Sequence, residues 1–128
     1  TMVRGLPGTN SMLPSTNMIR IYNHLPAEEL NAEMHKAALL ICRSGYSTVM
    51  DLALLGKKSI LIPTPGQTEQ EYLAALYQQQ QTACTTEQQQ FSLKSALKIA
   101  GSFNYHPFPL SGKNELQLLI RQFLASLQ

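Results

Sequence analysis

Apolar residues in this chain fall into short runs that alternate with segments of helical periodicity. The runs at 38–42 and 59–63 are apolar almost throughout, which is typical of parallel strands buried on both faces. Between them, the spacing of apolar residues and Gly56 in a capping position predict a helix over 47–55. The middle of the chain therefore has the order strand, helix, strand.

The same alternation extends toward both ends of the chain. Residues 2–6 and 18–22 predict two shorter strands, and Pro26 with the acidic residues after it predicts a helix of about three turns. Further helices are predicted over 69–80, 92–102 and 114–127. This order predicts an α/β fold, namely a Rossmann-like open parallel sheet with helices on both faces.

Length and composition limit the kinds of protein that this chain can be. With 128 residues, of which 44% are hydrophobic, the chain is long enough for one compact domain with one core. Its ten basic and eight acidic residues form no basic cluster, so nucleic acid is not an expected partner. No apolar stretch reaches the roughly 18 to 20 residues of a membrane span, and the first residues lack the order of a secretory signal. We therefore expect a soluble, cytoplasmic protein.

The cysteines and histidines do not form a metal or redox motif. Cys42 and Cys84 lie in segments that are predicted to be buried, and they lack the paired spacing of a zinc site. His24, His35 and His106 also lack metal-ligand spacing. We expect no metal ion and no cofactor, and a reducing cytoplasm fits these thiols.

Two junctions between a strand and a helix carry the candidate chemistry. In open α/β sheets, ligands bind beyond the carboxyl ends of the strands, where helix N-termini offer free N–H groups. The loop 44–48 is small and hydroxylic, and residues 64–71 bring amides and carboxylates beside it. Asp51, about one turn into the helix between them, could bind a ribose diol. Helix capping by the loop and a helix-dipole role for Asp51 are the structural alternatives.

The residues at these junctions resemble a known family. The run from Cys42 to Ala53 reads Cys-Arg-Ser-Gly-Tyr-Ser-Thr-Val-Met-Asp-Leu-Ala, and it is followed by Gly56, by Ile60-Leu61-Ile62-Pro63 and by Gln70-Glu71-Tyr72. This pattern resembles the C-terminal domain of family 28 glycosyltransferases, two-domain enzymes of the GT-B architecture that include the MurG-like transferases. The resemblance implies a donor domain that binds a nucleotide sugar, with UDP as the expected nucleotide.

The resemblance also implies roles for individual residues. In this family an acidic residue of the helix binds the donor ribose, the Ser-Gly loop lies by the nucleotide, and residues of the next loop contact the sugar. The residues placed at the nucleotide in this way are Ser44, Gly45, Tyr46, Ser47, Thr48, Asp51 and Leu25. Those placed at the sugar are Gln67, Gln70 and Glu71. Arg43 could pair with a phosphate, and a packing or salt-bridge role is an equal alternative.

Two residues depart from the best-known members of the family. Asp51 stands where those enzymes carry the longer glutamate, and Glu71 replaces the second residue of a glutamine pair. The sugar, the base or both can therefore differ from the best-known donor. The sequence does not assign a catalytic base.

The reaction implied by the resemblance is transfer of a hexose or N-acetylhexosamine from the nucleotide sugar to an acceptor. Residues 1–128 are expected to form an N-terminally truncated donor domain without its first strand-helix unit, and the acceptor-binding N-terminal domain is expected to lie outside the chain. The chain alone is then expected to be inactive, because half of an interdomain cleft cannot bring donor and acceptor together. Peripheral membrane contact is expected only through the full-length enzyme.

Two other functions share the same predicted site. One is a sugar-nucleotide epimerase or hydrolase of this architecture, since a donor site alone does not set the reaction. The other is an accessory domain that binds a nucleotide sugar without turning it over. A dehydrogenase is not expected, because the chain has no Gly-x-Gly-x-x-Gly.

Overall fold

The computed structural model describes residues 1–9, 11 and 14–109. The chain divides into two compact units, Thr1–Ala37 and Ala38–Gln128. Both have α/β structure, and every strand pairing among the described residues is parallel. These parallel pairings and the alternation of strands with helices confirm the predicted fold class.

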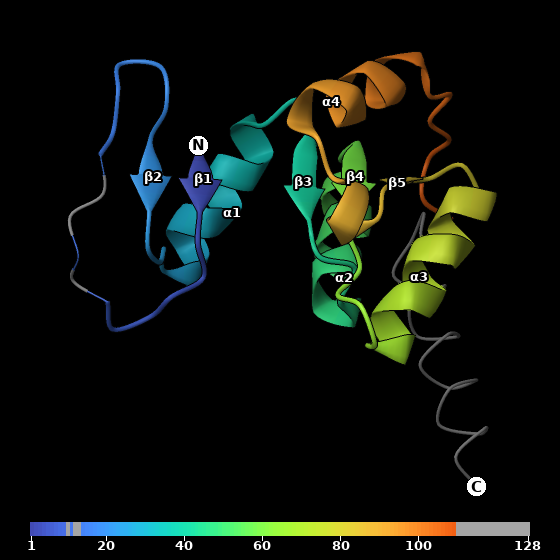
Figure 1. Cartoon of the computed structure of the whole chain (residues 1–128), viewed down its shortest axis with the longest axis horizontal. Coiled ribbons are helices and arrows are strands. Elements are labelled where there is room, and N and C mark those ends of the chain that lie inside the picture. Colours follow the sequence, from blue (N-terminus) through green and yellow to red (C-terminus); the bar gives the residue numbers. More distant parts are fainter. Residues whose placement is uncertain (10, 12–13, 110–128) are drawn as a thin grey trace, which may run out of the picture. The chain divides into compact units, whose positions relative to one another are not determined.

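The first unit contains two short strands and one helix (Figure 1). β1 (Met2–Val3) pairs with β2 (Ile21–Tyr22), and α1 (Ala27–Lys36) follows. The ten residues of α1 make the predicted three turns or so. Pro26 occupies the N-cap position of this helix.

Both strands are shorter than the predicted runs 2–6 and 18–22. Gly5 has a φ of 68°, which lies outside the extended region, and β1 ends before it. Before β2, the Thr16 hydroxyl accepts hydrogen bonds from the N–H groups of Met18, at 3.3 Å, and Ile19, at 3.0 Å. Because a side-chain hydroxyl here takes the place of a ladder partner, the chain turns where the apolar run predicts a strand.

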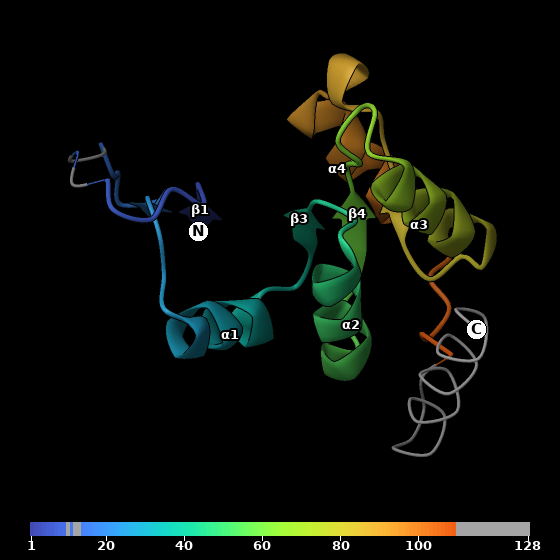
Figure 2. The ribbon, with the colours of Figure 1, turned by 90° about the horizontal axis from the view of Figure 1, so that it is seen from below.

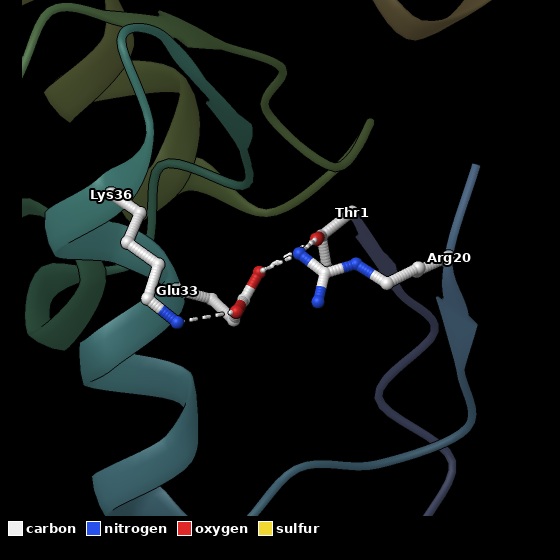
Figure 3. Close-up of polar contacts among 4 residues, drawn as sticks. All are labelled: Thr1, Arg20, Glu33 and Lys36. Atoms are coloured by element: carbon white, nitrogen blue, oxygen red, sulfur yellow. Dashed lines mark hydrogen bonds and ion pairs between the residues drawn. The ribbon is translucent and has the colours of Figure 1, made fainter. Parts of the chain in front are cut away.

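Glu33 of α1 connects the helix of the first unit to both strand segments (Figure 3). Its carboxylate accepts hydrogen bonds from the Thr1 hydroxyl at 2.6 Å and from the Lys36 ammonium at 3.2 Å. It also forms an ion pair with Arg20 at 3.4 Å. The hydrogen bonds from Thr1 and Lys36, and then the charge of Arg20, hold the pKa of Glu33 below its ordinary value of 4.5.

Replacing Thr1 by alanine is expected to raise the pKa of Glu33 toward that ordinary value, because the largest of these contributions is lost. A carboxyl with a lowered folded-state pKa stabilises the folded unit fully above its unfolded pKa, and the stabilisation is lost as the pH falls through the folded pKa. The measurement is an NMR titration of the Glu33 carboxyl carbon. Glu28→Gln is the control: Glu28 is exposed, lies on the same helix but not at a spacing that faces Glu33, and its change should leave the midpoint of Glu33 in place. An unchanged midpoint in Thr1→Ala contradicts the assignment of the Thr1 hydrogen bond as the largest cause of the lowered pKa.

The second unit is a three-stranded parallel sheet with helices on both faces (Figure 1). Its strands pair in the order β3 (Leu40–Cys42), β4 (Ser59–Leu61) and β5 (Cys84–Thr85), so β4 is central. Figure 2 shows helices on opposite faces of this sheet. The helical segments are α2 (Tyr46–Leu55), α3 (Thr68–Gln79), the single 3-10 turn η1 (Gln88–Gln90) and α4 (Leu93–Ser102).

The helices α2, α3 and α4 agree with their predicted ranges to within about one residue at each end. The further helix predicted over 114–127 lies outside the described residues. Gly56, with a φ of 60°, ends α2 in the left-handed conformation, and the N–H of Lys57 donates to the carbonyl of Leu52 at 3.1 Å. This pair of features confirms the predicted capping role of Gly56.

β4 carries the centre of the core in the second unit. Ile60 is fully buried and packs with Cys84, Ala96 and Ala100 on the face that α4 covers. Successive side chains of a strand point to opposite faces, so the equally buried Leu61 faces the other way. The helix α2 lies on that second face (Figure 2) and buries Val49, Leu52 and Ala53.

The prediction that residues 38–42 are buried on both faces is wrong. β3 begins at Leu40, and Ile41 at its centre is 38% exposed. The physical reason is the position of β3 at the edge of the three-stranded sheet, where fewer neighbours cover a side chain than on the central strand.

Candidate functional site

The carboxyl ends of β3 and β4 lead into two loops that meet. Ser44 follows β3, and its hydroxyl donates a hydrogen bond of 2.7 Å to the backbone carbonyl of Gln70 in the first turn of α3. The backbone N–H of Tyr46, the first residue of α2, donates to the Glu69 carboxylate at 3.2 Å. The structure therefore brings together the two junctions that the sequence marks as candidates.

The N-terminus of α2 has no cap of its own. Gly45 occupies the N-cap position without a side chain, and the first turn of the helix contains no acidic residue. The Glu69 carboxylate supplies the missing acceptor from the neighbouring helix. The start of α2 thus binds an anionic oxygen, as its free N–H groups and its positive dipole end favour.

Sequence analysis missed this role of Glu69. The residue has the position of an ordinary first-turn acid of α3, where the dipole of its own helix explains it. Its partner Tyr46 is 23 residues away in the sequence, so no local pattern shows the contact.

Asp51 is the sixth residue of α2 and is exposed. Its carboxylate forms no hydrogen bond or ion pair with any residue in the described part of the chain. Interaction with the helix dipole falls off within the first turn, and Asp51 lies beyond that turn. The helix dipole therefore explains little at Asp51, and its predicted role at the ribose stays a prediction.

The other predicted nucleotide residues of this loop differ in exposure. The Tyr46 side chain is 56% exposed, Ser47 is exposed and Thr48 is half-buried, whereas Ser44 is completely buried. Three of the four side chains can therefore be reached by a ligand at the start of α2. The Ser44 hydroxyl is occupied by its bond to Gln70.

The predicted sugar residues hold their own loop together. The side-chain carbonyl of Gln70 accepts a hydrogen bond from the N–H of Thr64 at 3.0 Å, and its amide donates to the side chain of Gln67. The Glu71 carboxylate accepts from the N–H of Gly66 at 2.9 Å. An amide and a carboxylate each have more donor or acceptor sites than these bonds use, so both side chains can still bind a ligand.

Arg43 links the ends of two strands. Its guanidinium donates to the backbone carbonyls of Ile62 at 3.1 Å and Pro63 at 3.4 Å. This contact supports the structural alternative for Arg43. The residue is exposed, so N–H groups of its guanidinium also remain within reach of an anion.

A groove of about 570 Å³ lies beyond the ends of β4 and β5, beside the first turn of α3. Prolines and alanines line it together with hydroxyl, amide and carboxylate groups, and no lysine or arginine is among the lining residues. These residues include Pro63, Glu71, Thr86, Glu87 and Gln88. Sequence analysis missed the part of the groove after β5, because the glutamine run 88–90 has the composition of a solvated loop.

Leu25 belongs to the first unit, whereas the other predicted site residues belong to the second. It follows β2 and precedes α1, and it is 6% exposed. A small hollow of about 210 Å³ in the same unit is lined in part by Leu25. Its predicted place at the nucleotide stays a prediction.

Neither cysteine among the described residues forms a disulfide. Burial raises the pKa of Cys42 to about 11, and burial also raises the pKa of Cys84, so both thiols are protonated at neutral pH. Within residues 1–9, 11 and 14–109, no group of three or more His, Cys, Asp or Glu residues could hold a metal ion. None of the described helices has the length and apolar character that crossing a bilayer requires.

The sequence of the chain was compared with those of known families. Residues 12–117 match the family described as the glycosyltransferase family 28 C-terminal domain. The chain belongs to this family. The match spans both candidate loops, α2 with Asp51, and the groove beside α3. No solved structure matches the chain.

Two curated relatives both carry the name UDP-N-acetylglucosamine--N-acetylmuramyl-(pentapeptide) pyrophosphoryl-undecaprenol N-acetylglucosamine transferase. The protein from Methylobacterium sp. (strain 4-46) is 45% identical over 47 residues, which are 37% of this chain and 13% of the relative. The protein from Desulforudis audaxviator is 41% identical over 69 residues, which are 52% of this chain and 17% of the relative. The chain thus spans less than a fifth of the length of these relatives.

Proposed function

We propose that this chain is the donor-binding domain of a glycosyltransferase and that it binds a nucleotide sugar at the carboxyl ends of β3 and β4. The observation that carries the proposal is the Asp51 carboxylate, exposed and without a partner in the described part of the chain, on a helix whose start already binds an anionic oxygen. Membership of the family supports the same class of ligand.

The diphosphate of the donor lies at the start of α2. The N–H of Tyr46 is bound there by the Glu69 carboxylate, and a phosphate oxygen carries the same kind of charge. A phosphate therefore replaces Glu69 in this hydrogen bond, and exposed Ser47 adds a hydroxyl donor. In a transfer reaction the amides at the helix start stabilise the diphosphate leaving group as its charge develops, and this needs no metal ion or other cofactor.

The ribose lies against Asp51. A carboxylate can accept hydrogen bonds from both hydroxyls of a ribose diol, and Asp51 stands about one turn beyond the diphosphate position. UDP is the proposed nucleotide, because the names of the relatives specify UDP-N-acetylglucosamine. The exposed face of Tyr46 is the proposed neighbour of the nucleoside.

The sugar extends toward the first turn of α3 and the groove beside it. Gln67, Gln70 and Glu71 lie at this turn, and Glu71 also lines the groove. Their amide and carboxylate groups match the donors and acceptors of sugar hydroxyls. A hexose or N-acetylhexosamine is the proposed sugar.

The complete protein transfers this sugar to an acceptor that a separate N-terminal domain binds, and residues 1–128 supply the donor half. The names of the relatives describe transfer to a lipid-linked acceptor. We assign the complete protein to the cytoplasm, where nucleotide sugars are available and thiols such as Cys42 stay reduced.

Calorimetry on the 128-residue chain tests the proposal. We expect binding of UDP and tighter binding of UDP-N-acetylglucosamine, since the sugar adds hydrogen bonds at the first turn of α3. The chain alone should transfer no sugar. Absence of binding of both ligands at millimolar concentration contradicts the donor-site assignment. Product analysis with the complete protein then separates a transferase from an epimerase, a hydrolase or a non-catalytic binding protein.

A further inference from the structure

Ser44 has a different place in the site from the one that its position in the Ser-Gly loop implies. Its side chain is completely buried, and its hydroxyl donates at 2.7 Å to the backbone carbonyl of Gln70. A hydroxyl has one proton, so Ser44 cannot donate to a ligand while this hydrogen bond holds. Burial also keeps a ligand away from its oxygen.

Gln70 connects Ser44 to the loop 64–67. Its side-chain carbonyl accepts from the N–H of Thr64 at 3.0 Å, and its amide donates to the side chain of Gln67. Thr64 begins the loop and Gln67 ends it as the N-cap residue of α3, so one side chain spans the loop. A shift in the first turn of α3 therefore moves this loop as well.

A second contact joins the same turn of α3 to the start of α2. It is the hydrogen bond from the Tyr46 N–H to the Glu69 carboxylate, which is exposed and 3.2 Å long. In the proposed complex a phosphate displaces Glu69 from this position. The bond from Ser44 is shorter and shielded from water, so it remains to hold the two loops in register.

We propose that Ser44 is a positioning residue of the donor site: it fixes the sugar-binding loop 64–67 through Gln70 and does not contact the nucleotide. The inference rests on the proposed function, because it assumes that the sugar lies at the first turn of α3. It assigns Ser44 to the sugar side of the site, although the residue stands in the loop that borders the nucleotide.

The test compares the affinities of Ser44→Ala for UDP and for UDP-N-acetylglucosamine by calorimetry. We expect the affinity for the nucleotide sugar to fall about three- to ten-fold, as for loss of one neutral hydrogen bond, while the affinity for UDP changes less than about two-fold. Ser95→Ala, the same substitution at an exposed position on α4, should change neither affinity. A parallel loss for both ligands, or no loss for either, overturns the proposal.

A double-mutant cycle with Gln70→Ala tests whether Ser44 acts through Gln70. In the Gln70→Ala chain, adding Ser44→Ala should lower the affinity for UDP-N-acetylglucosamine by less than about two-fold, because the loop has already lost its connection. Independent, multiplying losses overturn the proposal. Ser44→Cys keeps a weak donor at the same position, so it should show a smaller loss with the same selectivity, and it replaces Ser44→Ala if that chain does not fold.

Comparison of the wild-type chain with Ser44→Ala separates failure of the inference from failure of the proposed function. If the wild-type chain binds neither UDP nor UDP-N-acetylglucosamine, the donor site itself is wrong, and the positioning role falls with it. If the wild-type chain binds both and Ser44→Ala weakens both equally, the donor site stands and the positioning role is wrong.

Discussion

Replacing Asp51 by alanine is expected to weaken the binding of UDP by about ten- to a hundred-fold. The substitution removes a charged acceptor for the ribose diol, and hydrogen bonds to charged groups contribute roughly 1.5 to 3 kcal/mol. Asp51 is exposed and has no partner in the described part of the chain, so its removal leaves no other side chain there unpaired. The folded state should therefore be affected little, and the loss should appear in ligand affinity.

The decisive comparison uses UDP and its 2′-deoxy analogue. Wild type should prefer UDP, whereas Asp51→Ala should bind the two equally, because the group that reads the 2′-hydroxyl is gone. Glu28→Ala is the matched control, since Glu28 is an acidic residue of α1 and lies in the other unit. If wild type and Asp51→Ala bind both nucleotides with the same affinity, Asp51 has no role at the ribose.

Most of the second unit was predictable, because β3, β4 and the helices α2, α3 and α4 are each marked by a local pattern. The short strand β5 was not predicted. The apolar run at 59–63 contains β4, the central strand, and the helical spacing before Gly56 coincides with α2. A left-handed glycine can end a helix whatever surrounds it, so Gly56 marks the boundary from sequence alone. The exposure of Ile41 was not predictable, because an apolar run does not show which strand of a sheet lies at its edge.

For the candidate site, sequence analysis predicted where the loops lie but not how they are joined. The carboxyl ends of neighbouring parallel strands share one edge of a sheet, so the approach of the two junctions follows from topology. The partner of each side chain does not follow in this way. The bond between Ser44 and Gln70 and the cap that Glu69 provides for Tyr46 join residues more than twenty positions apart, and both depend on tertiary packing.

The largest effect on stability is expected for Leu52→Ala. Leu52 is completely buried on α2, on the face of the sheet opposite α4, and it sits next to Asp51 in the sequence. Truncating a buried leucine removes its transfer free energy and leaves a cavity, at a cost of about 2 to 5 kcal/mol in the free energy of unfolding. Small domains are stable by only about 5 to 15 kcal/mol, so this change removes a large share of the total.

Leu54→Ala is the matched control for this prediction, because it makes the same substitution two residues further along the same helix. Leu54 is 69% exposed, so its truncation should change the free energy of unfolding by no more than about 0.5 kcal/mol. Urea denaturation followed by circular dichroism measures both values, and equal m-values would show that the folded states are comparable. Similar losses for the two variants contradict the packing of α2 against the sheet. A large loss for Leu52→Ala alone shows that burial of this leucine holds α2 in place, and with it both Asp51 and the helix start where the diphosphate is proposed to bind.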